Sequence, residues 1–146
     1  AHALSIAKRK KHEVGVVLLG LDCFQEVAGQ HGPEVGDALL TTIADRLKQC
    51  MREVDTVARL GGDVFTCLLE GITCKNDMEI VAKRILASMT KPVKITNQDA
   101  VVTVSLGLAV FPLDGKDADE LLDCAKEAMT RAQEAGGNGY HLNVSQ

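Results

Sequence analysis

The sequence predicts a single α/β (or α+β) domain in which helices cover a mixed β-sheet, and three observations support this fold class. Two long apolar runs, residues 14–21 and 100–111, are typical of strands buried on both faces. Segments with apolar residues at helical spacing alternate with these runs. A glycine pair at residues 61–62 lies between two further apolar runs, which is a hairpin signal. We expect one domain over residues 1–146, with about five to six strands in the sheet and the order β-α-α-β-β-α-β-β-α-β.

The first half of the chain predicts a helix end, a strand and two helices in turn. Residues 1–12 are typical of the end of a helix, and "VGVVLLGL" (14–21) follows as the first strand. Residues 23–30 predict a short helix. Pro33 is acceptable in a first helical turn, so we expect the next helix to begin there. That helix has an apolar stripe made of Val35, Leu39, Leu40, Ile43, Leu47 and Met51.

The second half predicts a hairpin, two helices and the remaining strands. The hairpin covers residues 55–70, and Asn76 with Glu79 forms a capping-box pattern that starts a helix ending before Pro92. A polar turn then leads into one long strand, residues 100–111. The last helix carries Leu121, Leu122, Ala125, Met129 and Ala132 on one face, is closed by "AGGNG" (135–139), and precedes an edge strand in "YHLNV" (140–144).

Composition and charge exclude several classes of protein. The net charge is −4 and the main basic run is "KRKKH" (8–12), so we expect no DNA or RNA partner. The longest apolar run is too short to cross a bilayer. Five cysteines without C-x-x-C spacing predict neither a zinc site nor a disulfide framework, and favour a reducing compartment. We expect a cytoplasmic domain, or the cytoplasmic part of a membrane-anchored sensor. Because the chain starts at Ala1 without methionine, we expect it to be a fragment of a longer protein.

Three stretches, in order and at the right spacing, resemble the GGDEF family, whose active members condense two GTP into cyclic di-GMP. They are "VVLLGLDCFQEVAGQHGPEVGDALL", "RLGGDVFTCLLEGI" and "VTVSLGLAVFPLDGKDADELLDCAKEAMTRAQEAGGNGY". Together they cover nearly the whole chain. The resemblance implies a nucleotide-cyclase-like sandwich fold. The ending "LLEGI" is similar to the subset of GGDEF domains that precede an EAL phosphodiesterase domain, which implies a fused EAL domain in the full-length protein.

The signature hairpin of this chain is Gly61, Gly62, Asp63, Val64 and Phe65. The resemblance implies that Mg²⁺ would be held by an acid at the end of the first strand and by acids at the third and fourth signature positions. Here Gly20 and Val64 replace two of these acids, while Asp63 is present. Asp22, two residues after Gly20, is a candidate substrate-binding residue. Asp22 and Asp63 are the alternative metal ligands if the domain is active. We therefore expect no metal cofactor, or Mg²⁺ if the domain is active.

Substrate contacts depart from the family in the same way. Asp37 aligns with a guanine contact and is present, whereas the other implied contacts with guanine and phosphate are lost. The departing positions, including the metal acids, are Gly20, Gln25, Ala28, Val64, Gln133 and Gly137. Each lost transition-state contact is worth roughly 3–4 kcal/mol. The sequence thus predicts that the hairpin fold is retained and that its catalytic chemistry is lost.

"REVD" (52–55) matches the family's inhibitory product site, R-x-x-D, and lies at the family's distance before the glycine pair. The resemblance implies that Arg52, Asp55 and Arg84 bind cyclic di-GMP, since arginine can contact phosphate or guanine in bidentate fashion. The alternative is a surface ion pair between Arg52 and Asp55 at i, i+3 spacing.

Other residues also have a purely structural alternative. The two glycines suit a tight turn, Asp63 a solvated turn, Asp37 a helix start, and Phe65 a core position. We therefore expect a degenerate GGDEF domain that binds cyclic di-GMP or GTP and regulates rather than catalyses. The alternatives are an active diguanylate cyclase and a structural module that forms a homodimer without nucleotide.

Overall fold

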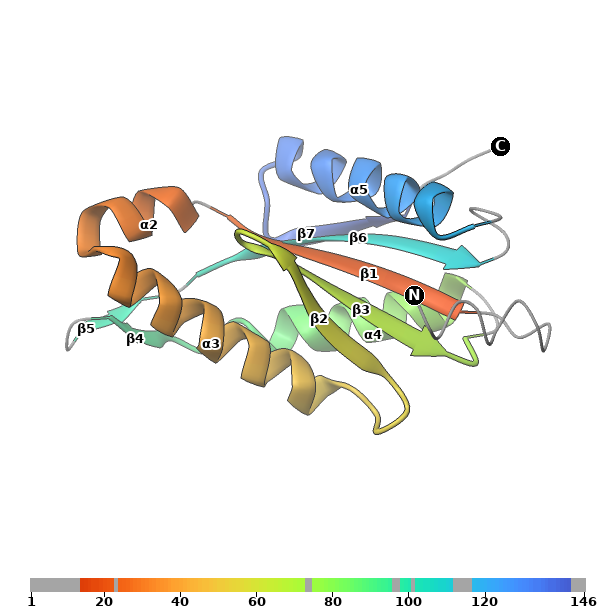
Figure 1. Ribbon diagram of the computed structural model, residues 1–146, viewed down its shortest axis with the longest axis horizontal. Helices are drawn as coiled ribbons and strands as arrows, with labels where there is room; N and C mark the ends of the chain where they lie inside the picture. The colour runs from red at the N-terminus through yellow and green to blue at the C-terminus, as the bar shows by residue number, and fades with distance from the viewer. Residues whose placement is uncertain are drawn as a thin grey trace.

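A mixed sheet of five strands forms the centre of the fold (Figure 1). The computed structural model describes residues 14–22, 24–72, 75–95, 98–100, 102–111 and 117–142. In spatial order the strands are β2 (Thr56–Gly61), β3 (Val64–Glu70), β1 (Val14–Leu21), β6 (Val104–Phe111) and β7 (Gly139–Leu142). Strand β1 pairs antiparallel with β3 and with β6, and β6 pairs parallel with β7. The predicted mixed sheet is confirmed.

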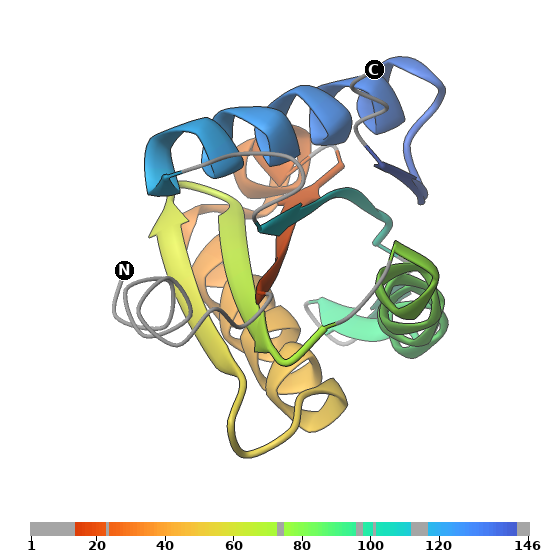
Figure 2. The ribbon, with the colours of Figure 1, turned by 90° about the vertical axis from the view of Figure 1, so that its right-hand side faces the viewer.

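Helices cover both faces of this sheet, as the end-on view shows (Figure 2). Helix α5 (Ala118–Glu134) lies on one face, and α3 (Pro33–Cys50) and α4 (Lys75–Ser88) lie on the other, with the short α2 (Phe24–His31) leading into α3. Every residue of β1 and of β6 is buried, because these two central strands are covered on both faces. The core therefore has two parts, one on each side of the sheet.

Helix α5 packs unusually close to the sheet at Gly107. A Cβ atom built on Gly107 would collide with the Ala125 carbonyl oxygen and with the Met129 backbone nitrogen. The N-terminus of α5 is capped by Asp117, whose carboxylate accepts a hydrogen bond from the Glu120 backbone N–H at 2.9 Å. This close packing fixes α5 against β6 and so positions Met129 and Gln133 over the end of β1.

The structure differs from the expected strands between residues 93 and 111. The expected single strand 100–111 is divided: β5 (Gln98–Ala100) pairs with β4 (Val93–Ile95) in a separate two-stranded sheet, and β6 begins at Val104. The observed order therefore has one strand more than predicted. The pattern of apolar residues predicts extended chain in this segment. It does not indicate that β5 pairs with β4 while β6 pairs with β1.

Three further expectations concern the helices. Helix α3 begins at Pro33 as predicted. Asn76 was expected to cap the next helix, but α4 begins at Lys75, so Asn76 lies inside the first turn and the expected boundary is wrong. The expected helix end at residues 1–12 lies outside the described residues. Within the described part of the chain, no helix combines the length and apolar character needed to cross a bilayer.

Candidate functional site

The tip of the β2–β3 hairpin is shaped by its two glycines and by Arg59. Gly61 and Gly62 have φ angles of 149° and 53°, in the region that residues with side chains rarely adopt. The Arg59 Nε and Nη2 atoms both donate to the Gly62 carbonyl oxygen, at 2.9 and 2.6 Å. A register shift between Arg59 and Gly61 adds a bulge at the same place. The turn thus has a complete structural explanation that needs no acid and no ligand.

The two positions at which metal acids were expected are direct neighbours in the sheet. Gly20 of β1 pairs with Val64 of β3 in the antiparallel register. A Cβ atom on Gly20 would lie 3.1 Å from the Met129 sulfur and 3.2 Å from the Gln133 side-chain nitrogen. Val64 is half-buried and packs against the apolar cluster below α5. Three of the departing positions, Gly20, Val64 and Gln133, therefore meet at one place, which has no carboxylate and no cation among them.

Asp22 follows β1 directly and is engaged in hydrogen bonds. Its carboxylate accepts from the Thr103 hydroxyl at 2.7 Å, the Ser105 hydroxyl at 2.7 Å and the Asn138 backbone N–H at 2.9 Å. Gly137, in the turn after α5, has a φ of 75°, and a Cβ atom there would lie 2.8 Å from the Asp22 carboxyl carbon. Asp22 joins the ends of β1 and β6 to this turn. A metal ion at Asp22 would compete with these three donors for the carboxylate oxygens.

The donors at the tip do not fit a magnesium site. Mg²⁺ requires near-octahedral oxygen ligands and is usually held by one or two carboxylates together with substrate phosphates. Asp63 is the acid left in the signature, its expected partner positions are Gly20 and Val64, and Asp22 is occupied by its three donors. In the described part of the chain, no group of three or more His, Cys, Asp or Glu residues could hold a metal ion.

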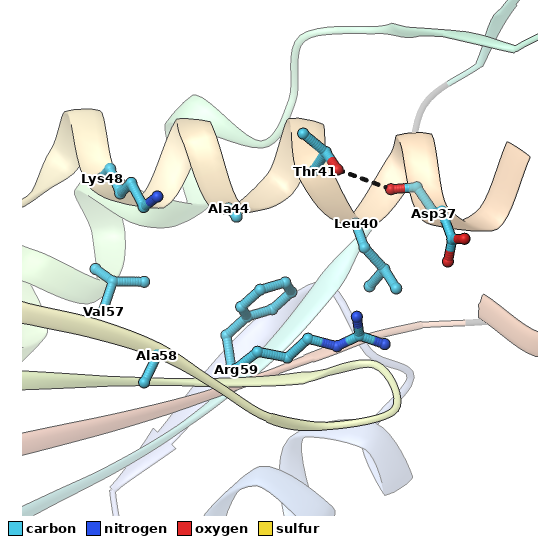
Figure 3. Close-up of a pocket in the computed structure, with 9 residues that line it drawn as sticks. Asp37, Leu40, Thr41, Ala44, Lys48, Val57, Ala58 and Arg59 are labelled. Carbon is cyan, nitrogen blue, oxygen red and sulfur yellow. Dashed lines mark hydrogen bonds between the residues drawn. The ribbon is translucent and has the colours of Figure 1, made fainter. Parts of the chain in front are cut away.

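Asp37 lines a groove of about 480 Å³ between α3 and β2 (Figure 3). Arg59 extends from β2 toward the end of the groove where Asp37 lies, and Lys48 lies near the other end. Thr41 donates its hydroxyl to the Asp37 backbone carbonyl at 3.0 Å, which leaves the Asp37 carboxylate out of this bond. The groove is lined by Asp37, Leu40, Thr41, Ala44, Lys48, Val57, Ala58, Arg59 and Phe65. Phe65 is only 3% exposed, as a core residue should be.

Arg52 and Asp55 form a tight turn at the other end of β2. The Arg52 Nε and Nη2 atoms donate to the two Asp55 carboxylate oxygens at 3.1 and 2.9 Å, and the Arg52 backbone N–H donates to the same carboxylate at 2.8 Å. Arg52 Nη2 also donates to the Glu70 carbonyl at 2.6 Å. The side-chain hydrogen bonding to Asp55 raises the pKa of the Arg52 guanidinium; burial opposes this rise, and the charges of Asp55 and Glu70 add to it. The expected ion pair exists, and its carboxylate is not a surface group: the Arg52 and Asp55 side chains are 53% and 3% exposed.

A cavity of about 210 Å³ brings Arg52, Asp55 and Arg84 together. Arg84 comes from α4, which lies beside the turn, so the three residues expected at a product site do share one cavity. The hairpin tip is separate from it, because β2 has six residues, or about 20 Å of strand, between the two turns. Lys48 in the groove and Ile80 in this cavity are among the lining residues that were not expected. Ile80 could have been found from its spacing of four residues before Arg84, which places both on one side of a helix.

Comparisons with known proteins agree with this architecture. A family model described as "Diguanylate cyclase, GGDEF domain" matches residues 1–139. The chain is 34% identical over 138 residues to the bifunctional diguanylate cyclase/cyclic di-GMP phosphodiesterase MucR of Pseudomonas aeruginosa, covering 94% of this chain and 20% of that protein. The chain therefore spans about a fifth of that relative's length.

Solved structures match over the full domain. The GGDEF domain of PA1120 (YfiN or TpbB) from Pseudomonas aeruginosa has a TM-score of 0.93 at 30% identity, covering 99% of this chain and 91% of that one. An EAL/GGDEF domain protein from M. capsulatus has a TM-score of 0.89 at 37% identity, covering 99% and 93%. With the family model and these relatives in agreement, the chain belongs to the GGDEF family, the domain family of cyclic di-GMP signalling.

Proposed function

We propose that this domain makes no cyclic di-GMP and acts as a regulatory module that binds cyclic di-GMP at Arg52, Asp55 and Arg84. One observation supports this most directly: two arginines from separate elements line one cavity, next to a carboxylate that orients one of them. At the hairpin tip, by contrast, glycine and valine lie side by side where two acids would be needed.

The proposed loss of catalysis rests on the side chains present around the hairpin tip. Phosphoryl transfer from GTP needs charge-stabilising groups around the triphosphate, and these act as positioned cations and metal ions. Position 20 has no side chain, position 64 is aliphatic, and positions 25 and 133 are neutral amides. A triphosphate at the tip would therefore meet little compensating charge, in a domain with a net charge of −4.

The cavity offers a different balance of charge. Arg52 is half-exposed while Asp55 is nearly buried behind it, so a ligand approaching from solvent meets the guanidinium first. Arg52 uses Nε and Nη2 in the turn, and Nη1 is the nitrogen outside those bonds. In this arrangement Asp55 acts as a positioning residue for Arg52. Arg84 supplies a second cation from α4. Two guanidinium groups that line one cavity, which Asp77 also lines, suit a ligand with phosphates and purine edges.

We also propose that the domain is one part of a longer cytoplasmic signalling protein and modulates a phosphodiesterase domain of the EAL type. The proposal is supported by the names of relatives at 34% and 32% identity, a bifunctional diguanylate cyclase/cyclic di-GMP phosphodiesterase and a cyclic di-GMP phosphodiesterase. A phosphodiesterase assay on the full-length protein, with and without Arg84→Ala, would test it. The proposal would be contradicted if added nucleotide changed the rate of hydrolysis equally in the wild type and in the Arg84→Ala variant.

Calorimetric titration of the domain with cyclic di-GMP and with GTP tests the proposed ligand. We expect micromolar cyclic di-GMP binding and weaker GTP binding, and Arg84→Ala should weaken the former about tenfold or more. Lys83→Ala is the matched control, since Lys83 is the exposed cation next to Arg84 in α4 and does not line the cavity. Absence of binding would favour a structural module. Formation of cyclic di-GMP from GTP, in proportion to protein and abolished by Asp63→Ala, would favour an active cyclase.

A further inference from the structure

We infer that Ile80 of α4 is the contact surface for the face of one nucleobase of a bound cyclic dinucleotide. The inference rests on the proposed function, because it concerns the same cavity, and it adds an apolar subsite to the two arginines. Ile80 lines that cavity together with Arg52 and Arg84, yet it is 52% exposed.

The size of the cavity implies that a dinucleotide extends beyond it. At about 210 Å³ it lies below the roughly 300–1,000 Å³ of pockets that enclose a drug-sized ligand. A cyclic dinucleotide has two bases, two sugars and two phosphates, so only a part of it can lie inside. The remainder must lie on the residues at the mouth. Ile80 is at that mouth, since its side chain both lines the cavity and reaches solvent.

The spacing of Ile80 and Arg84 along α4 indicates how a base would be oriented in this contact. Ile80 and Arg84 are four residues apart and therefore lie one above the other on the same side of the helix. A planar base can lie against Ile80 while its polar edge, or the adjoining phosphate, meets the Arg84 guanidinium. Val81 is half-buried beside them and continues the apolar surface inward. A base has an apolar face and a polar edge, and the cavity has the matching pair of surfaces.

A lone exposed isoleucine is common on protein surfaces and needs a reason to be singled out. Among the described residues, the large hydrophobic side chains that are most exposed are Val54, Leu60 and Ile80. Of these, Ile80 alone lines the cavity shared by Arg52 and Arg84, while Leu60 lies at the hairpin tip. Leu60 is also 52% exposed, so it provides a control of equal exposure and similar size at a site without the arginines.

The experiment is a calorimetric titration of cyclic di-GMP into the wild type and into Ile80→Ala, Ile80→Phe and Leu60→Ala. Removing the apolar contact in Ile80→Ala should weaken binding about fivefold. Ile80→Phe, which keeps an apolar surface and adds a ring that can stack, should bind within about twofold of the wild type or more tightly. Leu60→Ala should bind as the wild type does. All four proteins should unfold at the same urea concentration within error, since both positions are exposed.

A second measurement reports contact directly. In a protein with labelled isoleucine methyl groups, the Ile80 δ1 methyl resonance should move upfield through the ring current of the base, and saturate with the calorimetric curve. The buried Ile43 and Ile85 methyls serve as internal controls. If the wild type binds, Arg84→Ala weakens binding, but Ile80→Ala binds normally and its methyl resonance is unmoved, the inference is wrong and the proposed function stands. If the wild type does not bind, the proposed function fails first.

Discussion

The two turns at the ends of β2 are similar in composition and differ in what holds them. At the hairpin tip, Gly61 and Gly62 supply the backbone conformation, and Arg59 donates to the Gly62 carbonyl. No carboxylate takes part. At the opposite end, Arg52 and Asp55 hold each other and the backbone between them. There the side chains that could bind a ligand are the same ones that shape the turn.

The difference shows what the survival of a motif can mean. The glycines and Arg59 have a use in the fold that does not depend on acids at positions 20 and 64, so their presence is no sign of activity. Arg52 and Asp55 are also needed by their own turn, so their presence alone is weak support for a ligand. Arg84 is more informative, because it lies on another element and, among the described residues, it makes no hydrogen bond or ion pair with this turn. Ligand binding at this end is best judged from Arg84.

The largest effect we expect is on stability near the tip. Asp22→Ala should lower the free energy of unfolding by about 3 kcal/mol, because it removes the acceptor of three hydrogen bonds and leaves partly buried donors unpaired. Asp63→Ala, the matched acid in the turn, should change it by about 0.5 kcal/mol or less. Urea denaturation measures both. Equal stability of the two variants would mean that Asp22 is not a structural link.

A slightly smaller effect should appear at the other turn. Arg52→Lys should weaken cyclic di-GMP binding about 30-fold, or about 2 kcal/mol, since an ammonium cannot bond both Asp55 oxygens and the Glu70 carbonyl with fixed geometry. The same substitution in the hairpin, Arg59→Lys, should leave binding unchanged. Calorimetry compares the two variants. A similar loss in both would show that the two turns are not independent.

The pH dependence of stability should report on the strand below the Arg52 turn. Burial, and to a lesser extent the charges of Asp55 and Cys50, raise the pKa of the Cys67 thiol to about 12. In the unfolded chain a thiol ionises near about 8.5. The folded state therefore keeps its full stability below that pH and loses it as pH rises further, by about 1.4 kcal/mol at pH 9.5. Cys67→Val should show a smaller decrease between pH 8 and 9.5. Identical decreases would contradict the assignment.

The smallest effect is expected from restoring acids at the tip. Val64→Glu, alone or with Gly20→Asp, should give no detectable cyclic di-GMP, because Gln25, Gln133 and Gly137 still lack the cations that the family resemblance implies at these positions. Two acids at directly opposed positions of β1 and β3 would also repel each other. Chromatography of reactions with GTP and Mg²⁺ measures the product. Turnover that depends on the new glutamate would show that the acids alone were limiting.

Much of the fold could be predicted because its central elements have strong periodic signals. The buried strand β1, the proline-initiated α3, the glycine-containing hairpin and the amphipathic α5 were all expected near their observed positions. The division of residues 98–111 into β5 and β6 was not expected. Extended chain has the same residue pattern whichever strand it pairs with, so a change of partner leaves no local signal.

The site divides in the same way between local and non-local information. The Arg52–Asp55 pair follows from i, i+3 spacing and was foreseen as an alternative. The near-complete burial of Asp55 and the bond from Arg52 to Glu70 depend on β3 lying beside the turn. Likewise, the register that places Gly20 opposite Val64 is a property of the sheet. The resemblance to the GGDEF family identified positions 20 and 64 as lacking the expected acids. Only the tertiary structure shows that these two positions are neighbours.

The surroundings of Gly137 limit which side chains this turn can accept. Its backbone lies in a left-handed conformation, and the space for a side chain there is taken by the Asp22 carboxylate. An arginine placed at position 137 by a single mutation would strain the turn and push Asp22 away from Thr103 and Asn138. Stability would therefore fall before any phosphate contact could be regained. Under the proposed function, a cation at this turn would need compensating substitutions around Asp22, because the single change to arginine costs these contacts first.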